Sequence, residues 1–168
     1  YNPDVPGSVV FKRPNAKHQE LFGRNQPVVD VVLDPDLARI LRPNQIEGVK
    51  FMYEAVTGIS SLEQGHTTPG QGAILADEMG LGKTLQTIAL IATLLRQNCY
   101  FSNIRPGTVE KVLIVCPLTL VVNWKREFRK WIGRSSIGVL AVEGDGRKEV
   151  ERFVSVSYTH LTLPTSDL

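Results

Sequence analysis

A glycine turn ending in Gly82-Lys83-Thr84 constrains this chain more than any other stretch. The turn follows a short apolar run at residues 72–76, and apolar residues recur behind it at helical spacing. When a strand, a glycine turn and a helix come in this order, backbone N–H groups point into one concavity where the helix dipole favours an anion. The sequence therefore predicts a phosphate-binding loop. The alternative is an ordinary strand-to-helix turn with a chance Gly-Lys-Thr.

Each residue type in this loop has a chemical reason to be there. Gly80 and Gly82 let the main chain approach a phosphate closely, and Lys83 supplies a charge for the β and γ phosphates. The hydroxyl of Thr84 can coordinate Mg²⁺, so Thr84 is the expected metal ligand, and Lys83 and Thr84 are the expected catalytic residues. The residues expected to bind ATP along this loop are Asp77, Glu78, Met79, Gly80, Leu81, Gly82, Lys83, Thr84 and Leu85.

The strict loop pattern expects a glycine where this chain has Asp77. Taken with its neighbours, the stretch A-D-E-M-G-L-G-K-T resembles the first helicase motif of the Swi/Snf family of DNA-dependent ATPases, in which an acidic pair at this place is normal. A second motif of that family is similar to L-R-P-N-Q-I-E-G-V-K-F at residues 41–51. It implies that Gln45 binds adenine, since one carboxamide can pair with both N6 and N7 of that base.

A structural reading competes for residues 43–56. Pro43 suits the first turn of a helix, and Gln45 taken alone is a surface glutamine. The apolar face of this expected helix consists of Ile46, Val49, Met52, Tyr53 and Val56.

A third block begins with the apolar run at residues 112–117, which predicts a buried strand, and continues as a helix from 118 to 131. The block resembles the next motif of the same family, whose residues contact the backbone of one DNA strand through hydroxyls, main-chain N–H groups and basic side chains. The residues that match this motif are Pro117, Leu118, Thr119, Asn123 and Lys125. The expected core face of the helix consists of Leu120, Trp124, Phe128 and Trp131. Its basic residues are Lys125, Arg126, Arg129 and Lys130. The alternative to DNA contact for these four is an ordinary solvated face.

The expected fold class is α/β: a partial RecA-like parallel sheet with crossover helices, the first half of helicase lobe one. Its strands are expected at residues 73–76, 112–116 and 137–142. An extended accessory arm at 1–38 precedes the ATP-binding segment at 39–154. Surface loops are expected between Gly58 and Gly72 and from 96 to 110.

The composition excludes several classes of protein. The net charge is only +2, so affinity for DNA must come from local basic patches. Two cysteines are too few for a disulfide framework, and both read as reduced thiols of an intracellular protein. The histidines lack the spacing of a zinc site, so we expect no structural metal. No apolar run is long enough to span a bilayer, and no N-terminal signal segment is visible.

Within the family, residues 1–154 resemble most closely the recombinational-repair branch, the Rad fifty-four type and above all its B paralogue. The resemblance implies an ATP-dependent translocase on double-stranded DNA that acts in the nucleus on recombinase filaments and chromatin. Two other classes stay open. One is another nucleotide enzyme with a phosphate loop, such as a kinase or GTPase; the other is a non-catalytic module that binds a nucleotide or a partner.

Hydrolysis of ATP needs an acidic box and an arginine from a second lobe. No D-E-x-H sequence follows the third block. We therefore expect the full-length protein to be an ATPase and this chain alone to bind ATP weakly and turn it over negligibly. Residues 155–168 match nothing expected next in the family and look like translated sequencing-adaptor read-through, with a disordered splice-variant tail as the second interpretation.

Overall fold

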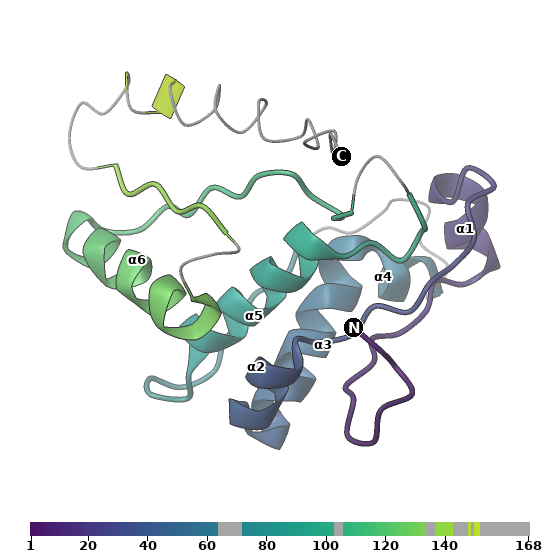
Figure 1. Ribbon diagram of the computed structural model, residues 1–168, viewed down its shortest axis with the longest axis horizontal. Helices are drawn as coiled ribbons and strands as arrows, with labels where there is room; N and C mark the ends of the chain where they lie inside the picture. Colours follow the sequence, from purple (N-terminus) through teal and green to yellow (C-terminus); the bar gives the residue numbers. More distant parts are fainter. Residues whose placement is uncertain (64–71, 103–105, 134–136, 143–147, 149, 152–168) are drawn as a thin grey trace, which may run out of the picture. The chain divides into compact units, whose positions relative to one another are not determined.

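The computed structural model describes residues 1–63, 72–102, 106–133, 137–142, 148 and 150–151 (Figure 1). It divides into two compact units, Tyr1–Leu113 and Ile114–Leu168. The first unit contains α1 (Ala16–Phe22), α2 (Pro35–Ile40), α3 (Pro43–Thr57), α4 (Ile59–Glu63) and α5 (Lys83–Arg96), and the second contains α6 (Leu118–Ile132). None of the described helices is long and apolar enough to cross a membrane.

The helix expected from residue 43 is confirmed as α3. Pro43 stands at its first position, and the Oε1 atom of Gln45 accepts a hydrogen bond from the backbone N–H of Arg42 at 2.9 Å. This bond satisfies one of the donors that the start of a helix leaves without a partner. The helix ends at Gly58, whose φ of 83° places it in the left-handed region. Its buried apolar side chains are Val49, Met52 and Tyr53.

The core of the first unit lies where α3 packs against α5. Tyr53 of α3 and Ile88 of α5 are fully buried. Phe11 of the N-terminal arm joins them, because its ring lies 4.5 Å from that of Tyr53. Burial of such apolar side chains is the main source of folding free energy, so the helix pair and the arm stabilise one another.

The N-terminal arm lies inside the first unit, which runs through the boundary expected at residue 38. Val10 forms an antiparallel bridge with Val32, and Val28 forms one with Tyr100. Arg13 holds Asp30 through two hydrogen bonds of 2.6 and 2.7 Å. The arm is thus tied both to itself and to the segment that follows α5.

The three expected strands are not formed in the described residues. Residues 72–78, 111–117 and 137–142 have no regular secondary structure, and the only bridges between described residues are the two isolated ones in the first unit. Three apolar side chains of these runs are exposed: Ile74 by 86%, Leu113 by 86% and Val115 by 87%. A parallel strand is stable only with hydrogen-bonded neighbours, and the described residues supply none for these runs.

The loop expected between Gly58 and Gly72 is wrong in its first part. Residues 59–63 form α4, and Ile59 and Leu62 on this helix are buried. The helix forms because these two side chains, three residues apart, lie on one face and pack inward. Residues 64–71 lie outside the described part of the chain, as do residues 143–147 and the tail from 152 to 168.

Candidate nucleotide-binding site

The predicted phosphate loop is a tight turn that leads directly into α5. Gly80 and Gly82 have φ angles of +88° and +81°, a region that L side chains rarely adopt. Gly82 is the N-cap residue and Lys83 the first residue of α5. The first N–H groups of a helix have no intrahelical acceptor, so this turn presents donors and the positive end of a helix dipole. A Cβ added to Gly80 would meet no atom within 4 Å, which shows open space on that side of the loop.

Lys83 is held by the loop itself. Its Nζ donates to the carbonyl oxygens of Asp77 at 2.6 Å and Glu78 at 2.9 Å. The ammonium therefore lies within the turn that is expected to hold phosphates. Lysine has three N–H donors, so one of them can bind a phosphate while these two hydrogen bonds remain.

Gln45 lies against the phosphate loop and not on the surface, so its reading as a surface glutamine is wrong. It is only 7% exposed, and its Nε2 donates to the carbonyl of Leu81 at 2.8 Å. A Cβ at Gly82 would overlap this Nε2. The structure thus brings together the two segments that the sequence singled out. Both polar ends of Gln45 are bonded to backbone here, and its contact with adenine stays a prediction.

Gln86 lies at this candidate site although the motif did not predict it. It is fully buried, and its Nε2 donates to Asp77 Oδ2 at 3.0 Å and lies 3.5 Å from the carbonyl oxygen of Leu81. The carbonyl of Leu81 therefore receives donors from both Gln45 and Gln86. A signal was present in the sequence, because Gln86 falls on the helical face that Ala89 and Thr93 bury. A polar side chain on such a face needs hydrogen-bond partners.

The remaining loop residues differ in what they offer to a ligand. Asp77 is half-buried, and its carboxylate is bound by Gln86, whereas Met79 is 96% exposed. Glu78 is exposed and accepts the N–H of Leu81 at 3.4 Å through its carbonyl oxygen. Half-buried residues complete the turn and the start of α5: Leu81, Gly82, Lys83, Thr84 and Leu85.

The second unit carries the segment expected to contact DNA. Pro117 is the N-cap residue of α6, and Leu118 and Thr119 in its first turn are exposed. Asn123 Oδ1 accepts from the guanidinium of Arg126 at 2.6 Å, and Lys125 is half-buried.

The expected core face of α6 is only partly confirmed. Phe128 is buried, whereas Leu120 is 44% exposed. Trp124 and Trp131 are half-buried. Trp131 lies beneath the Lys130 ammonium, 4.2 Å from the ring centroid, and donates from Nε1 to Glu127 at 2.8 Å. The indole N–H of Trp131 thus has a partner at the half-buried edge of the helix.

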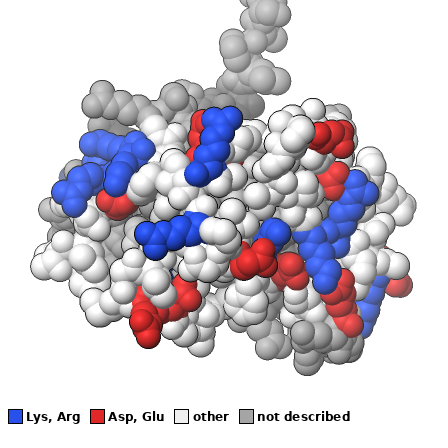
Figure 2. Space-filling model, turned by 90° about the horizontal axis from the view of Figure 1, so that it is seen from below, with Lys and Arg blue, Asp and Glu red and all other residues white. Residues whose placement is uncertain are grey.

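Charged side chains of both signs alternate on the face of the molecule shown in Figure 2. Lys and Arg side chains there have Asp and Glu side chains between them, which agrees with the net charge of +2. Long-range attraction of a polyanion is therefore weak.

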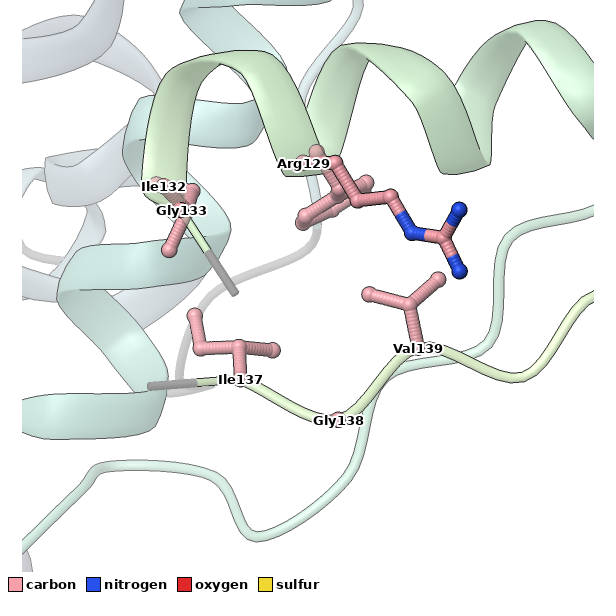
Figure 3. Close-up of a pocket in the computed structure, with 7 residues that line it drawn as sticks. Arg129, Ile132, Gly133, Ile137, Gly138 and Val139 are labelled. Atoms are coloured by element: carbon pink, nitrogen blue, oxygen red, sulfur yellow. The ribbon is translucent and has the colours of Figure 1, made fainter. Parts of the chain in front are cut away.

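A cavity of about 410 Å³ lies within the second unit (Figure 3). Ile137 and Val139 point toward α6, and the side chain of Arg129 extends over Val139 (Figure 3). None of the predicted site residues lines this cavity. Its lining residues are Phe128, Arg129, Ile132, Gly133, Ile137, Gly138 and Val139.

A glycine turn that caps a helix, with lysine and threonine at the first two helical positions, is typical of proteins with a phosphate-binding loop. The chain belongs to the SNF2 family, because residues 44–165 match the SNF2-related domain. Members of this family are DNA-dependent ATPases with a RecA-like helicase fold, which removes the kinase and GTPase alternative. The match includes residues 155–165, part of the tail that was expected to lie outside the family.

The relatives place the chain in the Rad54-type branch, as the sequence predicted. It is 49% identical over 156 residues to the DNA repair and recombination protein RAD54B of Gallus gallus, covering 92% of this chain and 16% of that protein. The RAD54B of Homo sapiens is 47% identical over 165 residues, which are 97% of this chain and 17% of that protein. DNA repair protein rhp54 of Schizosaccharomyces pombe is 43% identical over 163 residues, or 91% of this chain and 18% of that protein. The chain therefore spans about a sixth of the length of these curated relatives.

Proposed function

We propose that this chain forms the nucleotide-binding part of an ATP-dependent translocase on double-stranded DNA, which serves homologous-recombination repair and chromatin remodelling in the nucleus. The observation that carries the proposal is the phosphate loop, held from two sides by Gln45 and Gln86 at the start of α5. Membership of the SNF2 family supports a DNA-dependent ATPase activity, and the names of the relatives support a role in DNA repair.

The residues of the loop fit a nucleoside triphosphate with Mg²⁺. Gly80 and Gly82 hold the backbone in a turn with space beside Gly80, and Lys83 brings the positive charge. Thr84 would hold the metal ion, which neutralises charge on the phosphates when bound. Gln45 would contact adenine from the start of α3.

Contact with DNA is assigned to the start of α6. The N-terminal turn of this helix is exposed, so Pro117, Leu118 and Thr119 can approach a phosphate backbone. Asn123 and Lys125, two residues apart, add a carboxamide and a positive charge further along the helix. Such groups bind backbone phosphates without reading sequence. Recombinase filaments and chromatin would be the partners of the complete protein.

The sheet of the RecA-like lobe belongs to this proposal too. The apolar runs at residues 73–76 and 112–116 have the composition of buried parallel strands and expose large apolar side chains here. In the complete lobe these runs would pair with neighbouring strands, which would bury Ile74, Leu113 and Val115.

The proposal is tested by ATP binding and DNA-stimulated phosphate release in the complete protein and in its Lys83→Ala variant. We expect Lys83→Ala to weaken ATP binding by roughly tenfold or more, since a hydrogen bond to a charged group contributes about 1.5–3 kcal/mol. Phosphate release that DNA does not stimulate, or ATP binding that Lys83→Ala leaves unchanged, contradicts the proposal. In that case the chain is at most a non-catalytic binding module.

A further inference from the structure

The side-chain amide of Gln86 has only one possible orientation. The carboxylate of Asp77 and the carbonyl of Leu81 both accept hydrogen bonds and donate none. The NH₂ end of Gln86 must therefore face them, at 3.0 Å and 3.5 Å. This leaves Oε1 at the other end, where it is buried without a hydrogen-bond partner among the described residues.

The unsatisfied Oε1 lies against Gly48 of α3. A Cβ at Gly48 would overlap this oxygen, so α3 and α5 approach one another here only because residue 48 has no side chain. Burying an acceptor without a donor costs stability, and an apolar side chain of the same length would fill the space without that cost. What a glutamine adds at this place is its NH₂ group, directed at the phosphate loop.

The carbonyl that Gln86 faces determines the direction of a neighbouring N–H. In a trans peptide the C=O of one residue and the N–H of the next point to opposite sides. The described chain has no cis peptide, and the carbonyl of Leu81 points inward to Gln45 and Gln86. The N–H of Gly82 therefore points away from these side chains, toward the outer side of the turn. An N–H fixed in this way is ready to donate to an anion.

We propose that Gln86 is a positioning residue for the triphosphate of the nucleotide. It acts with Gln45 on the peptide between Leu81 and Gly82, and it anchors Asp77 at the place where the strict loop pattern has glycine. The inference rests on the proposed ATP site and adds to it a residue that touches no ligand. Gln86 acts through the loop, so its loss reduces phosphate affinity while the ligand groups themselves remain.

The test compares the buried Gln86 with the half-buried Gln97 in the complete protein. Gln86→Met keeps the length of the side chain and removes the NH₂, and Gln86→Glu keeps the shape but places a carboxylate beside Asp77. Gln97→Met is the matched control, because Gln97 follows the other end of α5 and bonds the backbone of Val32. The measurements are the dissociation constant of MgATP, KM and kcat for ATP, and the melting temperature of each variant.

We expect both Gln86 variants to raise the dissociation constant and KM for ATP by roughly tenfold, with a smaller change in kcat and with Glu worse than Met. Gln97→Met should lower the melting temperature and leave ATP affinity unchanged. If Gln86→Met binds ATP as Gln97→Met does, while Lys83→Ala weakens binding, the positioning role is overturned and the ATP site stands. If Lys83→Ala also has no effect, the ATP site itself is wrong.

A second pair of variants keeps the inference testable if Gln86→Met fails to fold. Gly48→Ala displaces the amide of Gln86 without changing a loop residue, so it should weaken ATP binding. In a Gln86→Ala background there is no amide to displace, and Gly48→Ala should then have little further effect. A double-mutant cycle measures this coupling. Additive effects of the two substitutions on ATP affinity overturn the inference.

Discussion

Gln97 pairs with Val32 as a neighbouring strand would. Its Oε1 accepts from the backbone N–H of Val32 at 3.0 Å, and its Nε2 donates to the carbonyl of the same residue at 2.7 Å. Val32 is fully buried, so these bonds satisfy backbone groups that water does not reach. One side chain thereby joins the N-terminal arm to the end of α5.

Replacement of Gln97 should destabilise the first unit. Gln97→Ala leaves the N–H and C=O of Val32 without these bonds, so we expect the free energy of unfolding to fall by about 1–3 kcal/mol. Urea denaturation followed by circular dichroism measures the change. Gln26→Ala is the control, because Gln26 is exposed, and it should leave the midpoint unchanged. Equal midpoints for Gln97→Ala and the unmodified chain would show that the pairing contributes nothing.

A side chain at Gly82 should impair both stability and ATP binding. Gly82→Ala places a Cβ on a residue with φ of +81° and drives it into Nε2 of Gln45. The backbone strain alone costs about 1–2 kcal/mol. Gly7→Ala is the matched control, since Gly7 has φ of +86° and a Cβ there meets no atom within 4 Å. We expect Gly7→Ala to lower stability only, and Gly82→Ala to weaken ATP binding as well. Equal ATP affinity in the two variants would contradict this prediction.

Stability should fall at alkaline pH because of buried tyrosines. Burial raises the pKa of Tyr100 to about 12, with the neighbouring Cys99 adding to the rise, and burial likewise raises the pKa of Tyr53. In the unfolded chain these phenols ionise near their usual pKa of about 10. The unfolded state therefore loses protons first, and the stability present below pH 10 is lost progressively as pH rises toward 12.

Urea midpoints measured at pH 9, 10, 11 and 12 check this dependence. Tyr100 also bonds Nδ1 of His18 at 2.6 Å, so Tyr100→Phe lowers stability at every pH. The informative quantity is the slope with pH, which should be smaller in Tyr100→Phe and smaller again with Tyr53→Phe added. A slope identical in all three proteins would mean that other groups cause the alkaline loss.

A contact of Lys125 with DNA phosphate should appear in the salt dependence of binding. Lys125→Ala in the complete protein should weaken binding to DNA of any sequence and reduce the slope of log affinity against log salt by roughly one. Arg39→Ala is the control, because Arg39 lies on α2 in the first unit and pairs with Asp36 at the surface. If Lys125→Ala behaves like Arg39→Ala, Lys125 faces only solvent.

Local patterns were sufficient to predict the long helices. The spacing of Val49 and Tyr53 predicted α3, and that of Ile88, Ala89 and Ala92 predicted α5, because each helix buries one face. The order of the motifs also predicted that Gln45 lies near the phosphate loop. These features depend on residues close together in the chain or on a resemblance with known spatial meaning.

The features that escaped prediction depend on contacts between distant residues. The spacing along α5 indicates that Gln86 is buried, but it does not reveal its neighbours Asp77, Leu81 and Gly48, which lie outside this helix. Helix α4 is too short for a periodic pattern, since only Ile59 and Leu62 face inward. The expected strands were read from apolar content alone, but a strand forms only where another strand lies beside it.

The burial of the N-terminal arm changes how truncated versions of this protein have to be interpreted. Removing residues 1–38 would delete Phe11, Val32 and Leu33, side chains that are 3%, 0% and 1% exposed, and would leave Tyr53 without its aromatic neighbour. We expect a deletion of this kind to unfold the first unit. Loss of a binding partner in such a deletion therefore reports a damaged core, and point substitutions at exposed positions of the arm are the sounder way to look for docking.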